Sequence, residues 1–195
     1  MRTRRDVLDM VLALTADEVE TAEAFYVSAC ADLNAFSEIT GIERELVGDI
    51  TAMLSPRVDV RRANKMAAEF LLNGSTEGIM AQRLGAIDNY LRQASEGTRQ
   101  LTQTPGSKVD LFARNLNGDF DSICCDVWIF RLFLPDEEYS PTPAKYQAIE
   151  GRIRELATAF GMSNAACQST LWSAIRKYHN EQVSVPVELC SHLPD

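Results

Sequence analysis

Apolar residues recur at helical spacing through most of this chain, and this periodicity constrains its fold more than any other feature. In residues 42–54, for example, Ile42, Leu46, Ile50 and Met53 fall on one helical stripe, the pattern of a helix packed against a core. Alternation with a period of two, which would indicate a strand, occurs only at residues 183–187. The sequence therefore predicts an all-α fold of about ten helices.

Capping and turn residues predict where these helices begin and end. Thr15 and Glu18 have the spacing of a capping box, and Ser163 is placed to cap the last helix. Ser55 followed by Pro56 predicts a helix with serine as its cap and proline as its first residue. The clearest expected helices span residues 15–34, 42–54, 77–94, 107–117 and 144–160.

Length and composition predict one soluble domain. The chain has 195 residues, of which 46% are hydrophobic and 24% charged, an ordinary balance for a globular protein. We expect two small helical lobes around a cleft, within a single domain spanning 1–195. Residues 1–40 are expected to form an acidic N-terminal helical extension, 41–180 the core and 181–195 a tail.

The sequence also predicts a cytoplasmic location and no metal-binding site. No apolar run approaches the roughly 20 residues that a membrane helix needs, and Asp6 and Asp9 interrupt the N-terminal apolar patch, which argues against a secretory signal. Five cysteines at irregular spacing indicate reduced thiols. The adjacent Cys124 and Cys125 are expected in the core, and His179 and His192 have no neighbours at zinc-binding spacing.

The net charge of −9 argues against a nucleic-acid partner, because affinity for phosphate comes from Lys and Arg. The charge is unevenly distributed: residues 1–55 carry −7, residues 56–131 carry +1 and residues 132–195 carry −3. The central segment can therefore present a local basic face in an otherwise acidic protein.

A turn in this central segment precedes an unusual aspartate. Pro105-Gly106-Ser107 is followed by Lys108 at the start of a helical pattern, and 18 residues later Asp126 precedes a second apolar helix. Taken alone, Asp126 is best interpreted as an N-cap and Lys108 as an exposed lysine. An aspartate between apolar residues is also a candidate for a functional site, because burying a carboxylate is costly.

Together, Pro105-Gly106-Ser107-Lys108, the 18-residue interval and Cys125-Asp126-Val127-Trp128 with Arg131 resemble the helix-hairpin-helix DNA glycosylase superfamily. Leu54-Ser55-Pro56 with Asn64 and Lys65, and Gln168, Trp172 and Arg176, extend the resemblance over roughly residues 50–178. The hairpin here is two residues shorter and lacks a second glycine, and Trp128 stands where many members carry histidine. These departures fit a divergent branch, such as a phage type.

The resemblance implies roles for individual residues. Asp126 would stabilise the oxocarbenium character of the sugar when the bond to a flipped base breaks, and Lys108 would attack C1′ in a lyase reaction. Some members of that superfamily hold an iron–sulfur cluster with four closely spaced cysteines, but here Cys167 and Cys190 are too few and too far apart, so no cofactor is expected. The implied DNA contacts are Pro105, Gly106, Ser107, Arg57, Arg61 and Arg131, and the implied base pocket is Asn64, Trp128, Gln168 and Trp172.

Two functional hypotheses follow. The first is a DNA glycosylase, with or without lyase activity, or a phage enzyme that remodels a modified base; its partner is double-stranded DNA with a damaged or modified base, and no membrane. The second is a helix-hairpin-helix module that binds DNA or protein without catalysis. The missing glycine and the acidic composition favour the module, whereas retention of both Lys108 and Asp126 favours the enzyme. The arginines near Arg57 and Arg61 are equally consistent with a solvated surface.

Overall fold

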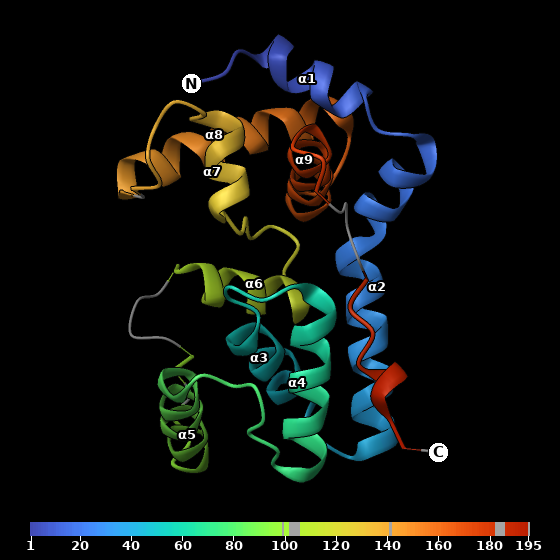
Figure 1. Cartoon of the computed structure of the whole chain (residues 1–195), viewed down its shortest axis with the longest axis vertical. Coiled ribbons are helices and arrows are strands. Elements are labelled where there is room, and N and C mark those ends of the chain that lie inside the picture. The colour runs from blue at the N-terminus through green and yellow to red at the C-terminus, as the bar shows by residue number, and fades with distance from the viewer. Residues whose placement is uncertain (99, 102–105, 141, 182–185, 195) are drawn as a thin grey trace. The chain divides into compact units, whose positions relative to one another are not determined.

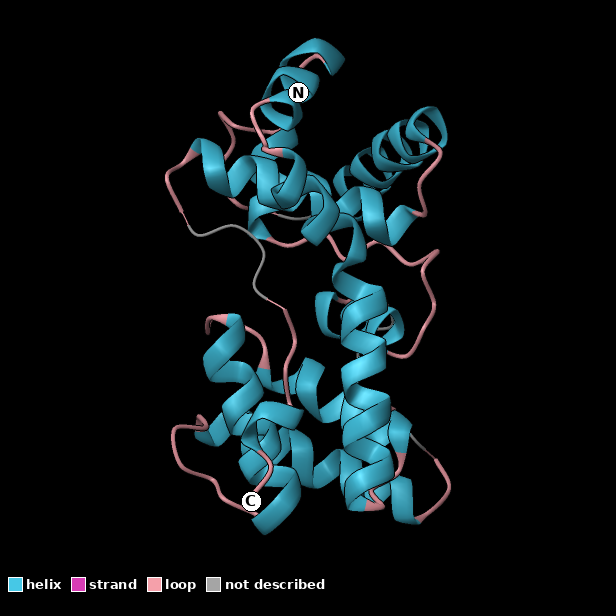
Figure 2. Ribbon diagram, turned by 90° about the vertical axis from the view of Figure 1, so that its right-hand side faces the viewer, coloured by secondary structure: helices cyan, strands magenta, loops and turns pink. Residues whose placement is uncertain are grey.

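The computed structural model describes residues 1–98, 100–101, 106–140, 142–181 and 186–194. Within these ranges every regular element is a helix, which confirms the predicted all-α class (Figure 1, Figure 2). Most of the alternating segment at 183–187 lies outside the described residues. The helices are α1 (Arg4–Leu12), α2 (Ala16–Thr40), α3 (Arg44–Leu54), α4 (Val60–Asn73), α5 (Ala81–Ser95), α6 (Lys108–Leu116), α7 (Val127–Phe133), α8 (Pro143–Phe160), α9 (Asn164–Tyr178) and the 3-10 helix η1 (Cys190–His192).

Local capping sets several helix starts where the sequence predicted them. The Thr15 hydroxyl accepts the Glu18 N–H at 3.3 Å, and the Thr15 N–H donates to Glu18 Oε2 at 2.7 Å, so the capping box is confirmed. Ser163 caps α9 as expected, accepting the N–H of Ala166 at 3.1 Å.

The expectation that Ser55 and Pro56 begin a helix was wrong. Helix α4 begins after Asp59, whose carboxylate accepts the Arg62 N–H at 2.9 Å. Arg57 has a positive φ of 58°, a conformation outside the right-handed helix, so the chain cannot continue helically from Pro56. Ser55 instead ends α3, where its N–H donates to the carbonyl of Ala52.

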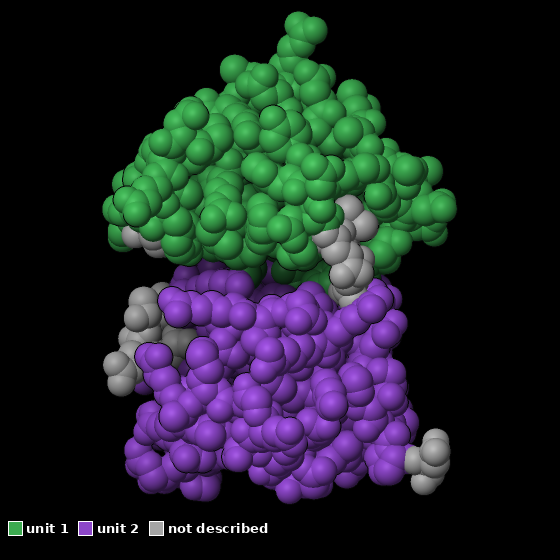
Figure 3. Space-filling view, in the orientation of Figure 1, with its two compact units in different colours: residues 1–26, 120–185 green, residues 27–119, 186–195 purple. Residues whose placement is uncertain are grey.

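The chain forms two compact units, each assembled from two separated stretches (Figure 3). Unit 1 contains residues 1–26 and 120–185, and unit 2 contains residues 27–119 and 186–195. Helix α2 contributes residues to both. The segment expected as an N-terminal extension is thus part of both units, and its residues Val7, Tyr26 and Phe36 are buried.

Helix α9 is central to unit 1, where it contacts α1, α7 and α8. Small side chains such as Ala165, Ser169 and Ala174 are buried along it, which allows its neighbours to approach closely. Burial of each large apolar side chain around it contributes about 1.5–3 kcal/mol. These core residues include Ile129, Phe130, Phe133, Ile149, Ile153 and Leu156.

Helix α3 is central to unit 2, where it contacts α4, α5 and α6. Every residue from Val47 to Leu54 is buried. Gly48 allows Asn117 to approach, because an added Cβ would lie 2.1 Å from Asn117 Oδ1. Asn117 Nδ2 donates to the buried Asp49 carboxylate at 3.0 Å, which fastens α3 to the end of α6.

No helix in the described ranges combines the length and apolar character needed to cross a bilayer.

Candidate functional site

Asp126 is the N-cap of α7, so the capping interpretation of this residue is confirmed. Its Oδ1 atom accepts the backbone N–H groups of Trp128 at 2.9 Å and Ile129 at 3.0 Å. These are two of the donors that the first turn of a helix leaves without helical partners. The carboxylate is therefore fixed at the positive end of α7, where a negative charge is favoured.

The second oxygen of Asp126 has a partner from a distant segment. Trp172 of α9 donates its indole N–H to Asp126 Oδ2 at 3.0 Å. Asp126 and Trp172 are both half-buried, and α7 packs against α9. Three donors thus orient one partly exposed carboxylate, and two of the residues predicted for the site, Asp126 and Trp172, are in direct contact.

Two arginines lie over the tryptophans beside this carboxylate. The Arg176 guanidinium lies 4.5 Å from the ring centroid of Trp172 and 5.5 Å from that of Trp128. The Arg131 guanidinium lies 5.0 Å from the Trp128 centroid. These distances are within the range of cation–π attraction. We call Trp128, Arg131, Trp172 and Arg176 the tryptophan–arginine cluster.

Aromatic residues at the end of α9 continue this cluster. The ring centroid of His179 lies 5.7 Å from that of Trp128, and the Tyr178 ring lies 5.2 Å from His179. The Arg2 guanidinium lies 5.4 Å from the Tyr178 centroid. Aromatic rings and guanidinium groups thus lie against one another where α7 packs on the end of α9 in unit 1.

The sequence predicts only part of this cluster. It gives His179 no role in a binding site, and Arg176 enters only through the family resemblance. A signal was present, because Trp172, Arg176 and His179 fall at positions i, i+4 and i+7 of one helix face. These residues come close to Trp128 and Arg131 only because α7 packs against α9. No local sequence pattern specifies that packing.

Gln168, predicted for the base pocket, lies in the core of unit 1. Only 4% of the residue is exposed, and its Oε1 atom accepts the Tyr26 hydroxyl at 2.9 Å. This hydrogen bond links α9 to α2 and satisfies a buried amide oxygen. The contact gives Gln168 a structural role in unit 1.

The predicted hairpin residues lie in unit 2 at the start of α6, except Pro105, which is outside the described residues. Ser107 caps α6 and Lys108 is its first residue. The Gly106 N–H, expected to bind phosphate, donates to Asp110 Oδ2 at 2.8 Å. Asp110 also pairs with Arg114 at 3.3 Å. The Gly106 N–H, which the resemblance assigns to a DNA phosphate, is thus already bound to a carboxylate of the protein.

The remaining predicted residues of unit 2 differ in burial. Arg57 and Arg61 are exposed, as a DNA contact requires. Asn64 is only 3% exposed, and its Nδ2 atom donates to the carbonyl of Pro186 at 3.3 Å, so it holds the C-terminal segment against α4. Lys108 and Asp126 belong to different units, and their convergence on one nucleotide stays a prediction.

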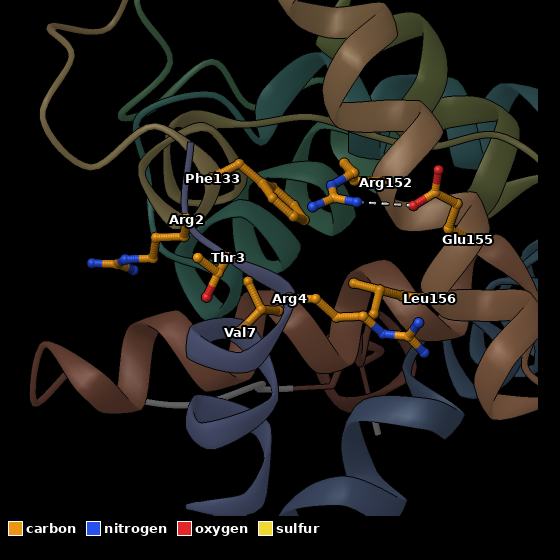
Figure 4. Close-up of a pocket in the computed structure, with 8 residues that line it drawn as sticks. All are labelled: Arg2, Thr3, Arg4, Val7, Phe133, Arg152, Glu155 and Leu156. Carbon is orange, nitrogen blue, oxygen red and sulfur yellow. Dashed lines mark hydrogen bonds and ion pairs between the residues drawn. The ribbon is translucent and has the colours of Figure 1, made fainter.

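A small hollow at the N-terminus of α1 is lined by Arg2, Arg4 and Arg152 together with Glu155 (Figure 4). Arg152 pairs with Glu155 at 3.1 Å, and the side chains of Arg2 and Arg4 extend in different directions (Figure 4). The three guanidinium groups therefore do not surround a common anion position.

The five cysteines are free thiols, and three of them are buried. Burial raises the pKa of Cys125, where the charges of its neighbours act in the same direction, and raises the pKa of Cys167 to about 12. No group of three or more His, Cys, Asp or Glu side chains within the described ranges is arranged to hold a metal ion. Cys124 and Cys125 are buried, as predicted.

Comparison with known proteins places the chain in a family without assigning it a function. Neither the curated proteins nor the solved structures contain a significant match. A family model described as "Family of unknown function (DUF7178)" matches residues 2–179. Because this match covers nearly the whole chain, the protein belongs to the DUF7178 family.

Proposed function

We propose that this protein acts on DNA as a base-excision glycosylase of the helix-hairpin-helix type. The observation that carries the proposal is the position of Asp126, an oriented carboxylate at the N-terminus of α7 beside the tryptophan–arginine cluster. A negative group next to flat aromatic faces and guanidinium groups suits a nucleotide whose base has left the stack. The all-helical fold and the residues around Lys108 and Asp126 support the same assignment.

In this reaction the N-glycosidic bond breaks and its electron pair leaves with the base. The sugar then has oxocarbenium character at C1′, which a nearby carboxylate stabilises. Water adds at C1′, and one of its protons is transferred to the departing base or to solvent. The products are the released base and an abasic site.

The hydrogen bonds of Asp126 favour electrostatic stabilisation over proton abstraction. Its two oxygens already accept three N–H groups, so the residue is better arranged to hold a fixed negative charge than to take a proton from water. A preoriented charge aimed at the developing cation lowers the barrier without reorganisation. Asp126 is therefore proposed as the stabiliser of the cationic sugar.

A lyase step would use Lys108. Its amine would attack C1′ to form a Schiff base with loss of water from the abasic sugar, and the strand would then break by elimination of the 3′ phosphate. This step requires the Lys108 amine to reach the same sugar as Asp126. Trapping with borohydride tests that requirement directly.

A non-catalytic DNA-binding module is the second candidate. The observation that favours it is the hydrogen bond from the Gly106 N–H to Asp110, because this carboxylate would repel a phosphate at the hairpin. A module of this kind would bind DNA through the tryptophan–arginine cluster and leave every base in place.

The test compares variants on duplexes that contain uracil, oxidised bases, alkylated bases or an abasic site. Asp126→Asn removes the charge but retains capping ability, and we expect it to abolish base release. Trp172→Phe removes the indole hydrogen bond and keeps the Asp126 charge, so it should lower base release less than Asp126→Asn does. Asp59→Asn alters the N-cap of α4 in the same way and is the matched control. Base release by Asp126→Asn at the wild-type rate would overturn the proposal, whereas DNA binding without release of any base would favour the module.

The lyase step is tested on the duplex with an abasic site. Lys108→Arg retains the positive charge and cannot form a Schiff base. We expect the borohydride adduct to disappear in this variant while base release persists. An adduct of undiminished yield would exclude Lys108 as the nucleophile.

A further inference from the structure

A cavity of about 710 Å³ lies in unit 2 along one side of α5. Gln82, Ala86, Asn89 and Gln93 recur at helical spacing along this side, and Met53 at the end of α3 contributes to the wall. Sites for small ligands usually have volumes of about 300–1,000 Å³. The cavity is therefore large enough for a nucleotide.

The charge of this cavity is opposite to that of the chain. Arg57 and Arg83 line it, and no aspartate or glutamate does among the described residues, although the net charge of the protein is −9. Arg83 is only 9% exposed, and its Nη1 atom donates to the Leu54 carbonyl at 2.9 Å. Burial, and then the charge of Arg57, lower the pKa of Arg83. Two neighbouring positive groups without a carboxylate are suited to an anion.

The backbone of Arg57 is strained in a way that a solvated surface residue does not require. Its φ of 58° lies in the left-handed region, which is unfavourable for a residue with a Cβ. Such conformations persist where the surrounding structure imposes them, and they are concentrated at ligand sites. The turn between α3 and α4 thus places the Arg57 side chain at the cavity at a cost in free energy.

We infer that this cavity binds a phosphate-bearing ligand of nucleotide size, with the phosphate at Arg57 and Arg83. The phosphate belongs either to a free nucleotide or to a nucleic-acid strand. The site does not depend on the chemistry proposed for Asp126, which lies in the other unit. Asp126→Asn is accordingly expected to leave binding at this cavity unchanged.

The experiment titrates the full chain with inorganic phosphate, each deoxynucleoside monophosphate and a single-stranded oligonucleotide, and measures heat or fluorescence. Arg57→Gly removes the guanidinium, and we expect it to weaken binding at least about tenfold, as loss of a charge-assisted hydrogen bond does. Its melting temperature should not fall, because glycine tolerates the positive φ. Arg154→Gln, on α8 of unit 1, removes the same charge at an exposed site and should bind as the wild type does.

A further variant tests the shape of the cavity. Gly85 lines the cavity, and an added Cβ there would meet nothing within 4 Å, so Gly85→Leu should occupy part of the space and weaken binding of the monophosphates while keeping both arginines.

Binding of the oligonucleotide alone, weakened by Arg57→Gly and Gly85→Leu, would assign the phosphate to a strand. Binding of the monophosphates with the same sensitivity would assign it to a free nucleotide. If no probe binds at millimolar concentration, or if both variants bind as the wild type does, the inference is wrong.

Discussion

The indole N–H of Trp172 donates to Oδ2 of Asp126 across 3.0 Å, and this bond joins two residues that are 46 positions apart. It is a tertiary hydrogen bond to a charged acceptor, whereas the other two hydrogen bonds of the carboxylate are local. The position of the charge therefore depends on α9 as well as on α7.

Trp172→Phe tests this dependence through stability. The substitution keeps an aromatic ring and removes the donor, and we expect the free energy of unfolding to fall by about 1–3 kcal/mol. Chemical denaturation measures the change. Trp128→Phe is the matched control, because the Trp128 side chain contacts the cluster through its ring. An equal loss in the two variants would mean that ring packing, not the hydrogen bond, stabilises this site.

Gly48→Ala should destabilise the protein, although replacing glycine by alanine in the middle of a helix is usually stabilising. The new Cβ would lie 2.1 Å from Asn117 Oδ1 and 3.1 Å from an Arg44 nitrogen, and moving Asn117 would break its hydrogen bond to Asp49. We expect a loss of about 1–3 kcal/mol in unfolding free energy. Gly151→Ala on α8 has open space around the new Cβ and should instead stabilise by about 0.5–1 kcal/mol. Thermal unfolding of the two variants in opposite directions would confirm the close approach, and a neutral Gly48→Ala would contradict it.

Acidification should weaken unit 1 through Glu18. Hydrogen bonds from Lys177 and from the Thr15 backbone lower the pKa of the Glu18 carboxyl below its usual value of 4.5. A lowered pKa in the folded state gives stability that is complete above the unfolded pKa and is lost as pH falls through the folded pKa. The melting temperature should therefore decrease below about pH 4.5, and less steeply in Glu18→Gln. Glu20→Gln changes an exposed neighbour on the same helix and should follow the wild-type curve.

The buried thiols should be inert in the folded protein. The pKa of Cys167 is raised to about 12 by burial, so at about pH 8 its thiolate fraction is roughly a thousandfold below that of an unfolded cysteine. Cys125 is shifted in the same direction. Alkylation followed by mass spectrometry should label both residues only after denaturation. Rapid labelling of Cys167 in the native state would show that unit 1 opens readily.

The sequence was informative where structure is local. The capping box at Thr15 and Glu18 and the cap at Ser163 each depend on residues within a few positions, and all were predicted. The predicted N-cap at Ser55 was wrong, because Asp59 caps α4 instead and Arg57 adopts a positive φ between them. Helix α1 was predicted only as part of a helical extension over residues 1–40, and its capping box, formed by Thr3 and Asp6, was not identified.

The candidate site was only partly predictable for the same reason. Asp126 could be recognised from the sequence because its capping role is local. Contacts that cross between helices could not, including the burial of Gln168 against Tyr26 and the placement of Arg176 over two tryptophans. A polar residue on a helix gives no local sign of whether it will face solvent or a partner in the core.

The division of each unit between distant stretches has a consequence during translation. Residues 27–119 leave the ribosome before α9, yet unit 2 also uses the C-terminal segment, where the Leu189 N–H donates to Asp32 at 2.6 Å. Asp126 is synthesised well before Trp172. The hydrogen bond between them can therefore form only after α9 has left the ribosome. A premature stop codon after residue 119 would therefore leave both cores unfinished, and one after Tyr178 would deprive unit 2 of its closing segment.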